Sequence, residues 1–192
     1  MNTGIHSKSM ASILAIAVTI GVLTDTLPAH ACGLEPSVNG GITISYPGSI
    51  DVAVAVASAR SSGLLPAAST EAITKETRLQ QMLTDLRRLQ TRLNKARDQI
   101  PNDSAAPFSL ALVGPGLWSH FHMSAGGVLA NYHTDGPLAG KVVVLTHATA
   151  LRAMLSGSLS IEHATEVGLV AYSGDETALI QRTIERGMQT KI

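Results

Sequence analysis

Apolar residues recur at alternating spacings of three and four from Leu79 to Ile100. This spacing places them on one side of an α-helix, so the sequence predicts a long amphipathic helix over about residues 70–100. Charged and amide side chains fill the positions between them and predict a solvated opposite side. The apolar stripe consists of Leu79, Met82, Leu86, Leu89, Leu93, Ala96 and Ile100.

A stripe of this length is rarely left in water, and two kinds of partner are open to it. In the first interpretation, the stripe is the seam of a coiled coil, and the chain is a homodimer or a scaffold that binds a partner protein. Alternatively, the helix lies on the chain's own domain. The heptad pattern is clean over only about three repeats, which favours the second interpretation.

The first residues carry the pattern of an export signal. Residues 1–9 are polar and include Lys8, and an apolar run follows from Met10 to Leu23. That run is shorter than the roughly 20 residues that span a bilayer. Ala29-His30-Ala31 then supplies a small-x-small cleavage site. The sequence predicts a signal peptide over residues 1–31, a periplasmic or secreted mature chain, and no transmembrane segment in that mature chain.

Cleavage after Ala31 makes Cys32 the first mature residue, which raises the alternative of a lipoprotein anchor. A lipobox prefers Leu and a small residue at the positions that Ala29 and His30 occupy, so the sequence disfavours acylation. Cys32 is the single cysteine of the chain. No intramolecular disulfide can form, and the core has to stabilise the fold.

Charge and aromatic content argue against nucleic-acid binding. Acidic and basic residues balance at 14 each, so no strong net field attracts a polyanion. Aromatic residues are 3% of the chain, too few for stacking platforms along a single strand.

The mature chain divides into two parts at a Pro-rich connection over residues 101–107. Residues 32–107 are expected to be helical after a short extended stretch at 42–46, with a helix over Ile50–Ser61 that Ser49 caps. Residues 108–192 are expected to form an α+β domain. Its predicted strands are 108–113, 117–123, 128–133, 141–146 and 169–172, and its predicted helices are 148–156, 161–167 and 176–188. Ser160 is expected to cap the second of these helices.

The run from Lys141 to Gln181 resembles the second half of a sterol-carrier-protein-2-like (SCP2-like) domain. The shared pattern is a strand, a helix ending in Leu-x-Gly, a short helix with a buried alanine, and a Gly-led strand ending in Gly-Asp. The resemblance covers about residues 108–186, and residues 33–100 have no clear counterpart. The matching residues are Leu155, Gly157, Leu159, Ala164, Gly168, Val170, Gly174 and Asp175.

This resemblance implies a small sheet covered by helices and an apolar cavity for a lipid or another hydrophobic molecule. The family pattern includes no catalytic residues. Some relatives use the domain as a non-catalytic module beside an enzyme. The candidate pocket residues are Trp118, Leu145, Leu151, Met154, Leu155, Leu159, Val170 and Leu179.

Histidines suggest a second kind of site. His120 and His122 are two apart on a predicted strand and share a face with Trp118. A hairpin turn at Ala125-Gly126 sets His133 opposite Trp118, and a turn one residue later sets it opposite His120. Either register puts three imidazoles on one face, where they would suit copper or zinc. The alternative is an ordinary solvated side of a hairpin.

Common catalytic motifs are absent: the chain contains no GxSxG, HExxH, CxxC or P-loop sequence. The sequence therefore predicts a non-catalytic exported binding or accessory protein with an apolar pocket. A periplasmic copper- or zinc-binding protein and a coiled-coil scaffold are the alternatives.

Overall fold

The computed structural model describes residues 44–68, 74–97, 106–124 and 126–190. The predicted signal peptide, Cys32, Ile100 and most of the 101–107 connection lie outside the described residues. The described chain is an α+β protein in which helices cover a mixed sheet. None of its helices combines the length and the hydropathy that a membrane crossing needs.

The sheet has the strand order β3-β2-β1-β4-β5. β1, β2 and β3 form an antiparallel meander, β4 returns parallel to β1, and β5 pairs antiparallel with β4. The parallel pair is buried on both faces, as the β-branched run of β4 predicts for that strand. The strands are β1 (Phe108–Leu112), β2 (Leu117–Ser124), β3 (Gly127–Thr134), β4 (Val142–Thr146) and β5 (Val170–Ser173).

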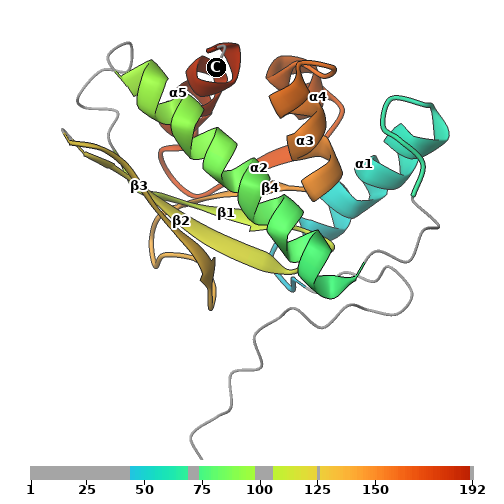
Figure 1. Ribbon diagram of the computed structural model, residues 1–192, viewed down its shortest axis with the longest axis horizontal. Coiled ribbons are helices and arrows are strands. Elements are labelled where there is room, and N and C mark those ends of the chain that lie inside the picture. The colour runs from blue at the N-terminus through green and yellow to red at the C-terminus, as the bar shows by residue number, and fades with distance from the viewer. Residues whose placement is uncertain (1–43, 69–73, 98–105, 125, 191–192) are drawn as a thin grey trace, which may run out of the picture.

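Helices α2, α3, α4 and α5 gather over one face of the sheet, and α1 lies beside α3 at the end away from the β2–β3 hairpin (Figure 1). This agrees with the predicted small sheet covered by helices. The helices are α1 (Ser49–Ser61), α2 (Lys75–Ala96), α3 (Ala148–Ser156), α4 (Ile161–Glu166) and α5 (Thr177–Gln189).

The predicted amphipathic helix is α2, and it begins at Lys75 rather than near residue 70. Thr74 caps it by accepting a hydrogen bond from the Thr77 N–H at 3.2 Å. Its apolar stripe packs against α3, α5 and β3, and Leu86 and Leu93 are fully buried. The stripe therefore lies on the chain's own domain, the second of the two interpretations.

Polar residues of α2 also protect the outer edge of the sheet. Asn94 Oδ1 accepts a hydrogen bond from the Val128 N–H at 2.7 Å, and Gln90 Nε2 donates to the Val128 carbonyl at 2.7 Å. The Tyr132 hydroxyl donates to Gln90 Oε1 at 2.6 Å. The first two bonds occupy the backbone N–H and carbonyl of Val128 in edge strand β3, which another chain would otherwise pair with.

Two predicted helix caps have different outcomes. Ser160 caps α4 by accepting from the His163 N–H at 3.1 Å, as predicted. Ser49 does not cap α1: Gly48 takes that position with φ 88°, and the Ser49 hydroxyl is buried without a hydrogen-bond partner among the described residues. A Cβ at Gly48 would come within 3.2 Å of Leu145, so packing selects glycine there.

The second face of the sheet is covered over β1 and β4 by segments from both halves of the chain. The Tyr46 ring meets Trp118 edge-on, with centroids 5.6 Å apart. The Leu138 N–H donates to Ser109 Oγ at 2.8 Å. Residues of α1, α2 and the sheet belong to one hydrophobic core, so the predicted division at residue 107 does not separate two cores.

Candidate functional site

Most of the residues predicted to line an apolar pocket are packed into the core. The six buried ones lie at 1–7% exposure within a continuous hydrophobic cluster. Trp118 and Leu179 are partly exposed. Trp118 and Leu145 share one face of the sheet because both pair with Ala111, whereas Val170 pairs with Thr146 and lies on the opposite face. The structure therefore does not gather the predicted set around one cavity. The buried six are Leu145, Leu151, Met154, Leu155, Leu159 and Val170.

The predicted histidine face forms in part. Trp118, His120 and His122 alternate with buried residues of β2 and so share one side of the strand. Ser124 pairs with Gly127, which is the register expected from the first of the two turns considered.

His133 does not take either predicted position. A bulge between Trp118 and Ser119 shifts the register, so Thr134 rather than His133 lies opposite Trp118, and Asn131 lies opposite His120. His133 has φ 61°, a left-handed conformation that a regular strand does not contain. The prediction failed because a bulge is a local backbone event that alternation does not reveal.

His120 is held by its hydrogen bonds. Its Nε2 lies 2.7 Å from the Gly136 carbonyl oxygen and 3.1 Å from Thr134 Oγ1. A carbonyl accepts only, so Nε2 carries the proton and Nδ1 is the nitrogen left for a ligand. No group of three or more His, Cys, Asp or Glu side chains suited to a metal occurs among the described residues.

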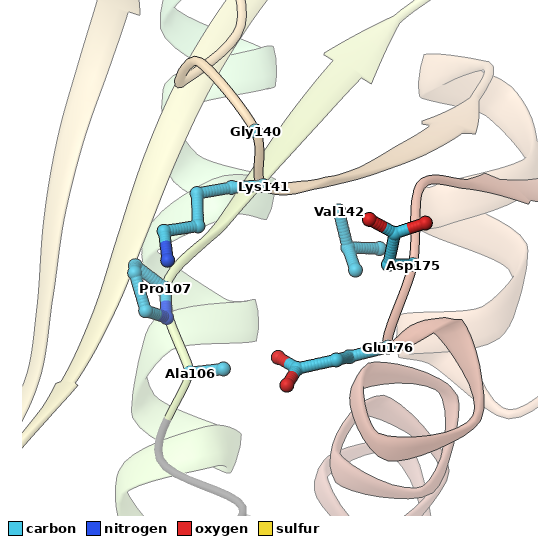
Figure 2. Close-up of a pocket in the computed structure, with 7 residues that line it drawn as sticks. All are labelled: Ala106, Pro107, Gly140, Lys141, Val142, Asp175 and Glu176. Carbon is cyan, nitrogen blue, oxygen red and sulfur yellow. The ribbon is translucent and has the colours of Figure 1, made fainter.

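A hollow of about 190 Å³ opens at another corner of the sheet, where β1 begins and the β5–α5 turn meets the start of β4. Figure 2 shows the Lys141 side chain on one wall and the Glu176 carboxylate on the other, with Asp175 beside Val142. Ala106, Pro107 and Gly140 complete the lining. None of the predicted pocket residues borders this hollow.

Two tight turns bring these charges together. Gly140 has φ +64° and precedes Lys141, whose N–H donates to the Leu138 carbonyl at 3.2 Å. Gly174 has φ +114°, and a Cβ there would lie 3.2 Å from Val142 Cα. A side chain at Gly174 would push the β5–α5 turn away from β4, so glycine keeps Asp175 and Glu176 at the border of the hollow.

The charges around the hollow are not paired with one another. Within the described part of the chain, no ion pair joins Lys141 to Asp175 or Glu176. All three side chains are exposed, whereas Val142 at the base is buried. The hollow therefore offers one ammonium and two carboxylates from opposite walls, with each charge still able to accept a new partner.

A second polar cluster lies where the parallel strands β1 and β4 end. His147 caps α3 by accepting from the Thr149 N–H at Nδ1, 3.1 Å away. Burial, helped by the nearby Arg60 charge, lowers the pKa of His147 to about 4. The ring is therefore neutral at pH 7, with its proton on Nε2.

The sequence held signals for the residues that the pocket prediction missed. Gly-Lys directly before a buried strand and Gly-Asp-Glu directly before a helix both indicate turns that carry charge. Sequence spacing shows neither that the two turns meet at one corner nor that Arg60 of α1 reaches the end of β4.

Comparisons with known proteins identify neither a family nor an activity for the chain. No family model and no curated protein matches the chain. Among solved structures, a stereoselective inverting sec-alkylsulfatase, Pisa1, from Pseudomonas sp. aligns with 17% identity and a TM-score of 0.34. That alignment covers 44% of this chain and 14% of the sulfatase, and at this level of likeness it supports no argument about fold or activity.

Proposed function

We propose that the chain is an exported, non-catalytic binding or accessory protein, and that the hollow between Lys141 and the Asp175–Glu176 turn receives a small zwitterionic solute. The observation that carries this proposal is the placement of opposite charges on facing walls without an ion pair between them. A ligand carboxylate would contact Lys141, and a ligand ammonium would contact Asp175 or Glu176.

The size and exposure of the hollow define the ligand and its affinity. At about 190 Å³ it is smaller than the roughly 300–1,000 Å³ of sites for drug-sized molecules. Charges that remain in contact with water contribute about 1 kcal/mol each at 4 Å. Two or three such contacts correspond to a dissociation constant of about 10 mM. The ligand is therefore a small amino-acid-like solute that the protein releases readily.

An apolar ligand is less well supported than the resemblance to the SCP2-like family implied. The buried members of the predicted pocket contact one another, and a lipid chain would have to displace that packing. Native mass spectrometry of the exported protein would test this directly, since co-purified lipid would contradict the proposal in favour of an apolar site.

The proposal is tested by NMR titration of the chain with glycine, acetate and methylammonium. Glycine is expected to bind more tightly than either singly charged probe, because it alone contacts both walls. Lys141→Gln and Glu176→Gln should each weaken glycine binding about fivefold, the factor that about 1 kcal/mol gives. Lys95→Gln, at an exposed lysine of α2, is the matched control and should leave binding unchanged.

Equal affinity for all three probes would show that the two walls do not act together. An effect of Lys95→Gln as large as that of Lys141→Gln would show that binding follows general charge rather than the hollow. Either result rejects the site.

Metal binding is a second candidate, and the orientation of His120 is what favours it. A carbonyl that holds one ring nitrogen is a common arrangement behind a metal-bound histidine. His122 lies on the same side of β2. Calorimetry with copper and zinc should show a site that His120→Ala and His122→Ala remove and that His163→Ala retains. Binding unaffected by the first two variants would exclude this candidate.

A further inference from the structure

Arg60, in the last turn of α1, brings a guanidinium to α3 without a carboxylate partner. Its Nη2 lies 3.5 Å from Thr149 Oγ1, a long contact between a cation and a neutral hydroxyl. Its Nε is buried without a hydrogen-bond partner among the described residues. The residue as a whole is partly exposed.

This leaves a partly desolvated positive charge with weak compensation. A charge taken out of water is costly unless an opposite charge or several hydrogen bonds replace the lost hydration. The carbonyl end of α1 offsets part of that cost, because helix C-termini favour cations. Neither ion pair recorded in the described part of the chain involves Arg60.

His147 adds a neutral donor beside this charge. Its Nδ1 is occupied by the Thr149 N–H, so the ring proton on Nε2 points away from α3 toward the Gly114 turn. A Cβ at Gly114 would lie 2.9 Å from His147 Nε2, and φ at Gly114 is +100°. Glycine thus keeps a side chain out of the space beside the imidazole N–H.

We propose that Arg60 and His147 form a binding site for a small oxyanion, either a carboxylate or a phosphate, at the carboxyl ends of β1 and β4. The anion contacts the Nη edge of Arg60 and accepts a hydrogen bond from His147 Nε2. A planar guanidinium matches two oxygens of a carboxylate or phosphate better than an ammonium does. This site is separate from the hollow at Lys141, and it stands or falls independently of the proposed function.

The test is NMR titration of the full chain with inorganic phosphate and with acetate, using chloride of equal ionic strength as the reference. Saturable shifts are expected at the Arg60 Nε–H and at the amides of Gly114 and Thr149. Bound anion also stabilises protonated His147, so the pKa of His147 should rise from about 4 as the probe is added. The Arg60 charge lowers the pKa of His147, so its effect is opposite to that of a bound anion.

Variants separate a site from general charge attraction. Arg60→Met should weaken binding at least about tenfold, and Arg60→Lys should weaken it less, because the charge remains but the planar fork is lost. Arg88→Met, at an exposed arginine of α2, is the matched control and should bind like the parent chain. The amide spectrum of each variant reports whether it is folded. If Arg60→Met does not fold, Arg60→Lys still tests the site.

Three results would overturn the proposal. The first is no saturable shift at about 10 mM probe, a concentration that fills most of a millimolar site. The second is binding that Arg60→Lys and a folded Arg60→Met leave unchanged. The third is an equal loss in Arg88→Met, which would assign the effect to net charge.

Discussion

Nε and Nη2 of Arg152 both contact Oδ2 of Asp85, at 2.9 and 2.8 Å. The pair joins α3 to α2 across the helical layer. The two partners differ in exposure: 6% of the Asp85 side chain reaches solvent, against 47% of the Arg152 side chain. Without the ion pair, Asp85 would therefore be a buried unpaired charge, whereas Arg152 could be hydrated by water.

This asymmetry predicts unequal mutational effects. Arg152→Met leaves a buried carboxylate without its partner and should lower the free energy of unfolding by about 2–3 kcal/mol. Asp85→Leu with Arg152→Met removes both charges and should recover most of that loss. Urea denaturation measures both, with Arg88→Met as the control. A double variant less stable than Arg152→Met would show that the pair matters for more than charge compensation.

Burial of the α2 stripe predicts the oligomeric behaviour of the chain. Leu86 is fully buried against the chain's own domain, so we expect a monomer by size exclusion with light scattering. Leu86→Glu should lose about 3–5 kcal/mol of stability, because it buries an unpaired charge. Arg88→Glu, on the solvated side of the same helix, should remain close to the parent. A parent dimer with a folded monomeric Leu86→Glu variant would instead support the coiled-coil seam.

The lowered pKa of His147 predicts a loss of stability in mild acid. Between about pH 6.5 and pH 4 the unfolded chain binds a proton at this ring that the folded chain does not bind. The stabilising contribution is complete above pH 6.5 and is lost as pH falls toward 4, up to about 3 kcal/mol.

His147→Asn should flatten that part of the pH profile, because asparagine keeps an acceptor for the Thr149 N–H without titrating in this range. Thermal unfolding from pH 4 to pH 7.5 gives the measurement, and His163→Asn, at an exposed position, is the control. A profile identical in the parent and in His147→Asn would refute the assignment.

Two glycines beside the hollow provide a matched comparison. Both have positive φ, but a Cβ at Gly140 meets nothing within 4 Å, whereas a Cβ at Gly174 meets the backbone of Val142 and Lys141. Gly140→Ala should cost about 1 kcal/mol for its left-handed backbone alone. Gly174→Ala adds steric overlap and should cost about 2 kcal/mol or more. Equal losses in thermal unfolding would show that the β5–α5 turn is free to move away from β4.

Local pattern alone was sufficient for most of the secondary structure. The spacing of Leu79, Leu86 and Leu93 identified α2 and its buried side, and β-branched residues identified β4. Ser160 marked the start of α4, and Gly157 marked the end of α3 in a left-handed conformation. These features depend on residues within one or two turns of each other, so nearby sequence contains the information.

Tertiary packing decided the features that involve distant parts of the chain. Whether the stripe of α2 faced a partner or its own sheet depended on α3 and α5, which lie far along the sequence. The register shift between Trp118 and Ser119 moved the His133 imidazole from its predicted position, and six of the expected pocket residues became part of the buried core cluster. Lys141 and Glu176, like Arg60 and His147, become neighbours only when separate elements pack together. Periodicity reports which side of an element is buried, but it carries no information about what lies opposite that side.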